Sequence, residues 1–332
     1  MIADAAQQRL DALAKPPGSL GRLERLAIRL AETQGTLAPE TRPRRLLVFA
    51  GDHGVVAEGV GLWPAEVTAA MMRLMLDGRS SCAALARASG TEFLLIDAGS
   101  KAPSFRPQPG YQDRRIAHGT ANLAREPAMT VAQFDAAWAL GARAAEEAAA
   151  DGIRVLAIGE MGIGNTTAAA CLAALLTGAE PATMVGPGAG ATPESLARKR
   201  AAVATALTRA HAEPELRRAI AGLCGYEIAA MAGCIAAASR LGLTLVLDGF
   251  ITGAAALVAR ALEPDALRTA IAAHRGEEPG HAPVLAALGL EPSLDWQLRL
   301  GEGSGALLLL PLLDAAAALL REVATLAEVI GG

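Results

Sequence analysis

The chain has 332 residues, enough to bury the core of one large α/β domain or of two ordinary ones. Its formal net charge is −4, and its lysines and arginines are scattered. No basic stripe is therefore available to hold a phosphate backbone, and we expect no nucleic-acid partner. Hydrophobic residues make up 52% of the sequence and aromatic residues only 3%, which favours buried strands and closely packed helices.

The most apolar stretch runs from Ala306 to Leu320 and contains Pro311 and Asp314. It is shorter than the roughly 20 apolar residues that a membrane span requires, so we predict a buried core helix and no membrane partner. The first residues include Asp4 and Arg9 and lack the apolar segment of an export signal. We therefore expect a cytoplasmic protein.

The sequence predicts neither a metal site nor a cofactor. The four cysteines include no Cys-x-x-Cys pair and fit reduced thiols in the core. The five histidines show no short ligand spacing, since the closest pair, His274 and His281, is separated by a Pro-Gly turn.

Strand, turn and helix patterns alternate along most of the chain. After two amphipathic helices joined at Lys15-Pro16-Pro17-Gly18, apolar runs of strand type occur at residues 46–50, 93–96, 154–158 and 243–247. Helical patterns follow at residues 131–149, 167–176, 193–209, 227–238 and 254–262. Continuous apolar strands that end in glycine or acidic residues belong to parallel sheets covered on both faces. We predict an α/β fold with a Rossmann-like, doubly wound, mostly parallel sheet that binds ligands at the carboxyl ends of its strands.

The two ends of the chain read as helical and carry no strand pattern. We predict that residues 1–39 and 301–332 pack together as a small helical subdomain beside a catalytic α/β domain of residues 40–300.

The segment from Gly159 to Thr167 lies between a predicted strand and an Ala-rich helix. Closely spaced glycines can turn backbone N–H groups toward an anion, and the helix adds its positive N-terminal end. Because Thr167 stands where a dinucleotide fingerprint has its third glycine, the segment predicts a phosphate site and no dinucleotide site. Glu160 adds a carboxylate that a simple turn does not need.

Two further loops are ambiguous from their residues alone. A second glycine loop, residues 185–190, leads into a helix that carries Lys199, and the charged run around Lys199 favours a solvated side chain. The polar segment from His274 to His281 reads as a surface loop.

Glu302 lies in the segment Arg299-Leu300-Gly301-Glu302-Gly303-Ser304-Gly305, between an apolar stretch and a hydrophobic helix. Ser304 suits capping of that helix, which leaves the carboxylate free for another role. Burial in such a loop raises a carboxyl pKa toward neutrality, as a general base requires.

The segment from Leu245 to Gly253 resembles the acidic loop with which ordinary phosphoribosyltransferases hold phosphoribosyl pyrophosphate. That loop carries two adjacent acids, whereas here Asp248 is followed by Gly249. We keep an enzyme dependent on phosphoribosyl pyrophosphate as the alternative function.

Taken in order, these loops resemble the nicotinate-nucleotide:dimethylbenzimidazole phosphoribosyltransferase family. The segments that carry the resemblance cover nearly the whole chain and are Lys15–Gly21, Phe49–Val55, Gly159–Thr167, Asp248–Phe250, Glu278–His281 and Arg299–Gly303. The resemblance implies a Rossmann-like sheet, a helical domain built from both termini and a homodimer. It also implies transfer of ribose phosphate from nicotinate mononucleotide to a benzimidazole-type base, a step in making the lower ligand of cobalamin.

The resemblance implies roles for individual residues. Glu302 matches the general base, and Glu160 matches a second acidic residue near the nicotinate. The positions matching the phosphate and ribose site are Gly162, Gly164, Asn165, Gly188, Lys199 and Gly276. Those matching the pocket of the acceptor base are Gly61, Ala70, Met161 and Leu300.

Several positions depart from the family pattern. Gly276 stands where serine is usual, so a phosphate-binding hydroxyl is missing, although the backbone N–H remains. Pro187 and Ala189 replace Arg and Thr in the second glycine loop, and Gly61 and Ala70 stand where we expect Ser and Gln. These departures leave the acceptor base open, and a non-catalytic relative that binds nucleotides as a sensor is a further alternative.

Overall fold

The computed structural model describes residues 1–331 and contains one six-stranded sheet. All strand pairs are parallel, and the strand order is β3-β2-β1-β4-β5-β6. The strands are β1 (Arg44–Gly51), β2 (Glu92–Gly99), β3 (Tyr111–Asp113), β4 (Val155–Met161), β5 (Thr244–Leu247) and β6 (Ala270–Ala272). This is the order of a doubly wound Rossmann sheet, so the predicted fold class is confirmed.

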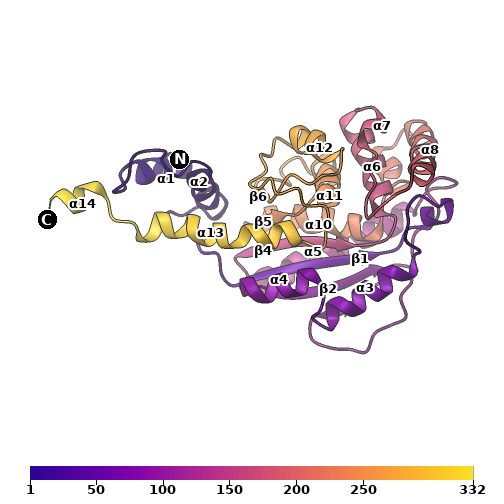
Figure 1. Ribbon diagram of the computed structural model, residues 1–332, viewed down its shortest axis with the longest axis horizontal. Helices are drawn as coiled ribbons and strands as arrows, with labels where there is room; N and C mark the ends of the chain where they lie inside the picture. The colour runs from indigo at the N-terminus through magenta and orange to yellow at the C-terminus, as the bar shows by residue number, and fades with distance from the viewer. Residues whose placement is uncertain (332) are drawn as a thin grey trace.

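Helices cover both faces of the sheet, as Figure 1 shows. On one face lie α5 (Val131–Ala150), α6 (Asn165–Thr177), α7 (Pro181–Met184), α8 (Pro193–His211), α9 (Leu216–Ala221), α10 (Tyr226–Leu241), α11 (Phe250–Leu262) and α12 (His281–Leu288). On the other lie α1 (Ile2–Asp11), α2 (Arg22–Gln34), α3 (Glu66–Leu76), α4 (Ser81–Ser89) and α13 (Ser304–Glu322). The short η1 (Gly54–Glu58) follows β1, and α14 (Leu326–Ile330) ends the chain.

Side chains of β1 alternate between two buried cores. Leu47 and Phe49 belong to the core under α5, α6, α10 and α11, whereas Leu46 and Val48 belong to the core under α13. Every residue of β1 is buried, because both faces of a parallel sheet are covered. The continuous apolar runs in the sequence follow from this double burial.

The helices at the two chain ends lie side by side, at the end of the molecule far from α6 and α8 (Figure 1). The Arg9 guanidinium donates to the carbonyl oxygen of Val323 at 2.8 Å, and Leu13 forms an antiparallel bridge with Thr325. α13 contacts α2 at this end and α4 and β4 at the other. The boundaries of the helical subdomain remain a prediction, since α13 packs against both parts.

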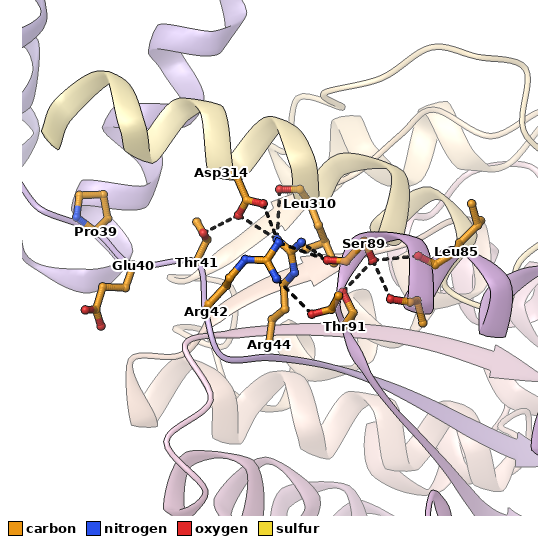
Figure 2. Close-up of polar contacts among 12 residues, drawn as sticks. Pro39, Glu40, Thr41, Arg42, Arg44, Leu85, Ser89, Thr91, Leu310 and Asp314 are labelled. Carbon is orange, nitrogen blue, oxygen red and sulfur yellow. Dashed lines mark hydrogen bonds and ion pairs between the residues drawn. The ribbon is translucent and has the colours of Figure 1, made fainter. Parts of the chain in front are cut away.

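A partly buried ion pair fixes the middle of α13 to the start of β1. Figure 2 shows Asp314 facing Arg44, Arg42 and Thr41, with an Arg44 Nη1 to Asp314 Oδ1 distance of 2.9 Å. Burial lowers the pKa of Arg44, and the Asp314 carboxylate opposes that shift. α13 is apolar and long enough to cross a membrane by composition, but 56% of its apolar window is buried inside the fold. We therefore interpret it as the core helix that the sequence predicts.

Candidate active site

A cavity of about 420 Å³ lies at the carboxyl edge of the sheet. Its walls come from the segments that follow β4, β5 and β6, from α3 and from the loop before α13. Of the residues predicted for the site, those that line this cavity are Glu160, Met161, Gly162, Asn165, Gly188, Gly276, Leu300 and Glu302. A smaller recess of about 60 Å³ beside it is lined by Gly61, Gly164 and Lys199.

Glu302 is buried, although it lies in a loop, with an exposure of only 4%. Its backbone is left-handed at φ 59°, between Gly301 at φ 89° and Gly303 at φ 77°. A non-glycine residue rarely adopts this conformation, which persists where the surroundings fix it, often at functional sites. Its Oε2 atom has no hydrogen-bond partner, and burial raises the pKa of the carboxyl group. A buried carboxylate that has one oxygen without a partner and a raised pKa has the properties of a general base.

Asp248, which follows β5, holds the Glu302 loop in place. Its carboxylate accepts hydrogen bonds from the N–H groups of Gly303 at 3.1 Å, Gly305 at 2.7 Å and Ala306 at 3.1 Å. It therefore caps α13, whereas the sequence assigned capping to Ser304. Three of the about four hydrogen bonds that its oxygens can accept are therefore used within the protein, which makes Asp248 a weaker partner for ribose hydroxyls.

Glu160 is the next-to-last residue of β4 and accepts a hydrogen bond from the Asn165 side-chain amide. Burial raises the pKa of Glu160 to about 8, and the negative charges of Asp248, Glu227 and Glu302 add to the shift. The carboxyl group is thus largely protonated at neutral pH. A Cβ atom on Gly301 would lie 2.5 Å from Glu160 Oε1, so the Glu302 loop packs directly on this side chain.

Lys199 is buried at 2% exposure and is not the solvated charge that its sequence neighbours allow. Its ammonium donates to Thr166 Oγ1 and to the carbonyl oxygen of Gly186, each at 2.8 Å. Burial lowers its pKa to about 8, while the charge of Glu278 opposes the shift. With two N–H groups engaged, a third is left for an anion at the recess.

Two predicted phosphate-binding N–H groups are engaged within the protein. The N–H of Gly188 donates to Glu278 Oε1 at 2.8 Å, and that of Gly276 donates to His281 Nδ1 at 2.8 Å. The N–H that the sequence left available at Gly276 is therefore already used. As an acceptor, His281 is neutral, and burial lowers its pKa to about 4.

The predicted base pocket needs correction on α3. Ala70 is exposed and does not line the cavity, whereas Val67 and Met71 of the same helix do. Gly61 lines only the small recess. Between the recess and the cavity stands Trp63, which lines both and donates from its indole N–H to the carbonyl oxygen of Ala189 at 3.2 Å.

His274 also lines the cavity, although its sequence neighbourhood suggested a surface loop. Its Nε2 atom lies 3.6 Å from Asp248 Oδ1, and its exposure is 3%. Burial lowers the pKa of His274, but the carboxylate of Asp248 outweighs burial and raises it overall. No group of three or more His, Cys, Asp or Glu side chains that could hold a metal ion occurs among residues 1–331.

A Rossmann sheet with a glycine loop and two buried carboxylates at its carboxyl edge suits a nucleotide-using transferase. In agreement, the family model described as phosphoribosyltransferase matches residues 1–330. The chain is 44% identical to a nicotinate-nucleotide–dimethylbenzimidazole phosphoribosyltransferase of Solidesulfovibrio magneticus, over 97% of this chain and 92% of the relative. It is 47% identical to the enzyme of that name from Azotobacter vinelandii, over the same shares of both chains.

A solved structure leads to the same family. The crystal structure of CobT from Thermus thermophilus superimposes with a TM-score of 0.95 and 44% identity, covering 99% of this chain and 98% of that one. The chain belongs to the nicotinate-nucleotide–dimethylbenzimidazole phosphoribosyltransferase family. The family resemblance read from the loops is thereby confirmed.

Proposed function

We propose that this protein transfers the phosphoribosyl group of nicotinate mononucleotide to 5,6-dimethylbenzimidazole or a related base. The products are an α-ribazole phosphate-type nucleotide and nicotinate, in the synthesis of the cobalamin lower ligand. The observation that carries the proposal is the buried Glu302 carboxylate, whose Oε2 has no partner, in the same cavity as Glu160 and the glycine loop after β4. A proton acceptor and an anion-binding loop thus border the same cavity.

The chemistry needs one proton acceptor. A ring nitrogen of the acceptor base attacks C1′ of the ribose, and the bond from C1′ to the nicotinate nitrogen breaks. Its electron pair neutralises the positively charged ring, which leaves as nicotinate, while Glu302 accepts the N–H proton of the attacking base. Attack opposite to the leaving group inverts C1′ and gives the α-glycosidic bond.

Glu160 and Lys199 supply the surroundings of the donor nucleotide. With a pKa of about 8, Glu160 is neutral at physiological pH and can lie beside an anionic nicotinate without repulsion. The Lys199 ammonium and the N-terminus of α6 attract the 5′-phosphate. A bound phosphate would favour the charged form of Lys199, whose pKa burial lowers to about 8.

The acceptor base would contact an apolar wall. This wall consists of Trp63, Val67, Met71, Ile163 and Leu300. None of these side chains carries a carboxylate or an amide, so the wall favours a methylated benzimidazole over a purine with an exocyclic amine.

Transfer from phosphoribosyl pyrophosphate is the second candidate, since Asp248 lines the cavity. The three N–H groups held by Asp248 count against it, because they leave that carboxylate only about one further hydrogen bond for ribose hydroxyls. A non-catalytic sensor would bind the mononucleotide without turnover.

We also propose a cytoplasmic homodimer. Exposed apolar side chains on α14 support an interface, with exposures of 52% for Leu326, 61% for Val329 and 74% for Ile330. Light scattering of the purified protein tests the assembly.

Chromatography of reaction mixtures tests the activity. Nicotinate should be released from nicotinate mononucleotide only when an acceptor base is present, and most rapidly with 5,6-dimethylbenzimidazole in a panel that includes adenine. Turnover with phosphoribosyl pyrophosphate and magnesium, but not with the mononucleotide, would favour the second candidate. Binding of the mononucleotide without turnover of any base would favour the sensor.

A further inference from the structure

A buried pair of ionisable side chains lies behind the glycine loop that follows β4, and it does not line the cavity. His53 and Glu227 are both fully buried, with 0% side-chain exposure, and His53 Nε2 lies 2.6 Å from Glu227 Oε1. His53 follows β1, and Glu227 lies in the first turn of α10. The pair therefore joins two elements that are 174 residues apart in the sequence.

Gly51 and Gly225 lack side chains and so leave room for the His53–Glu227 pair beside the main chain. A Cβ atom on Gly225 would lie 2.5 Å from Glu227 Oε2 and would also clash with the His53 ring. A Cβ atom on Gly51, the last residue of β1, would clash with the same carboxylate oxygen. The main chain therefore encloses the pair, and a loss of either partner leaves a buried polar group without its counterpart.

The loop of residues 162–166 packs directly on Gly51 and His53. A Cβ atom on Gly162 would clash with the carbonyl oxygen of Gly51, and one on Gly164 would lie 3.1 Å from His53 Cβ. The pair thus reaches Gly162 through Gly51, and His53 packs against Gly164 together with Val56. Asn165, the next residue, bonds to Glu160, so the support extends to the carboxyl group at the end of β4.

We propose that His53 and Glu227 are positioning residues. They hold the loop of residues 162–166 in the position that binds the mononucleotide phosphate. Because neither side chain touches the cavity, their effect passes through Gly51, Gly162 and Gly164. Displacement of the loop weakens phosphate binding, while the Glu302 loop keeps its separate support from Asp248. This inference rests on the proposed function.

Kinetics of Glu227→Ala test the inference. The KM for nicotinate mononucleotide should rise roughly 10- to 100-fold, since a displacement of about 1 Å at a binding loop has effects of that size. The KM for the acceptor base should change by less than about threefold, because only Ile163 of its five wall residues lies in the displaced loop. Glu227→Gln, which keeps the side-chain volume and one acceptor oxygen, should recover most of the mononucleotide affinity.

Asp314→Ala is the control, because it breaks another ion pair, partly buried and outside the cavity lining, between Asp314 and the buried Arg44. It should lower the thermal midpoint while leaving the KM for the mononucleotide unchanged. A wild-type KM in Glu227→Ala overturns the inference, as does an equal rise in Asp314→Ala. If Glu227→Ala does not fold, His53→Gln is measured instead, and a wild-type KM there also overturns it. Failure of the proposed function is distinct, since the wild-type protein would then release no nicotinate.

Discussion

Replacement of Asp248 by Asn should affect both stability and catalysis. In the wild-type protein, one carboxylate oxygen accepts from Gly305 and Ala306 and the other from Gly303. Asn keeps a single acceptor oxygen, so the N–H of Gly303 faces an amide N–H. The loss of one charge-assisted bond and of the negative charge at the N-terminus of α13 costs about 2–4 kcal/mol. For a chain of 332 residues, this corresponds to a fall in Tm of about 3–6 °C.

The same substitution releases Glu302 from its left-handed conformation. A shift of about 1 Å in the general base would lower kcat by roughly 10- to 100-fold. Urea unfolding and steady-state kinetics measure the two effects. Asp97→Asn is the control, because Asp97 likewise holds N–H groups, those of Gly99 and Ser100, after β2 and lies outside the cavity. If Asp248→Asn loses stability but keeps the wild-type kcat, Asp248 does not position Glu302.

Three further variants and one control, Gly242→Ala, test other parts of the structure. Lys199→Met should raise the KM for nicotinate mononucleotide roughly 10- to 100-fold through the loss of a charge-assisted bond, and an unchanged KM would remove Lys199 from the phosphate site. Gly301→Ala should cost about 2–4 kcal/mol in urea unfolding and also lower kcat, since φ is +89° and the new Cβ would lie 2.5 Å from Glu160 Oε1. Gly242→Ala, at φ +70° with open space around it, should cost only about 1 kcal/mol and keep kcat. Glu160→Gln tests the pH dependence of folding: because the folded pKa of about 8 is raised from 4.5, the folded protein binds more protons than the unfolded chain between these values. The stability contributed by protonated Glu160 is complete below pH 4.5 and is lost as the pH rises through about 8. The free energy of unfolding in urea should therefore decline less with rising pH in Glu160→Gln than in the wild-type protein. Parallel plots of unfolding free energy against pH for the two proteins would contradict the raised pKa.

The long central strands could be predicted from the sequence, whereas the edge strands could not. β1, β2, β4 and β5 contain continuous apolar runs, because both faces of the sheet are covered. β3 and β6 have only three residues each, too few for a pattern to emerge. The glycine loop after β4 could be placed at the ligand-binding edge in advance, because it follows a parallel strand, whereas the loop of residues 185–190 follows a helix.

Side-chain roles that depend on distant contacts were harder to predict. Lys199 lies in a charged run, and its burial follows from Thr166, which is 33 residues away. Asp248 acts on N–H groups of a loop more than 50 residues later, so the local sequence could not show its capping role. On α3, a difference of one residue decides between the exposed Ala70 and the cavity-lining Met71, since successive helical residues point about 100° apart. The spacing of Val67 and Met71 at i and i+4 was the available signal.

The role of Glu302 as general base is the central claim, and Glu302→Gln tests it most directly. Gln keeps the size and polarity of the side chain but cannot accept the proton, so kcat for nicotinate release with 5,6-dimethylbenzimidazole should fall by about 10²- to 10⁴-fold. The dissociation constant for nicotinate mononucleotide, measured by calorimetry, should stay near the wild-type value. A Glu302→Gln protein that releases nicotinate at the wild-type rate would contradict the account and make Glu160 the candidate base.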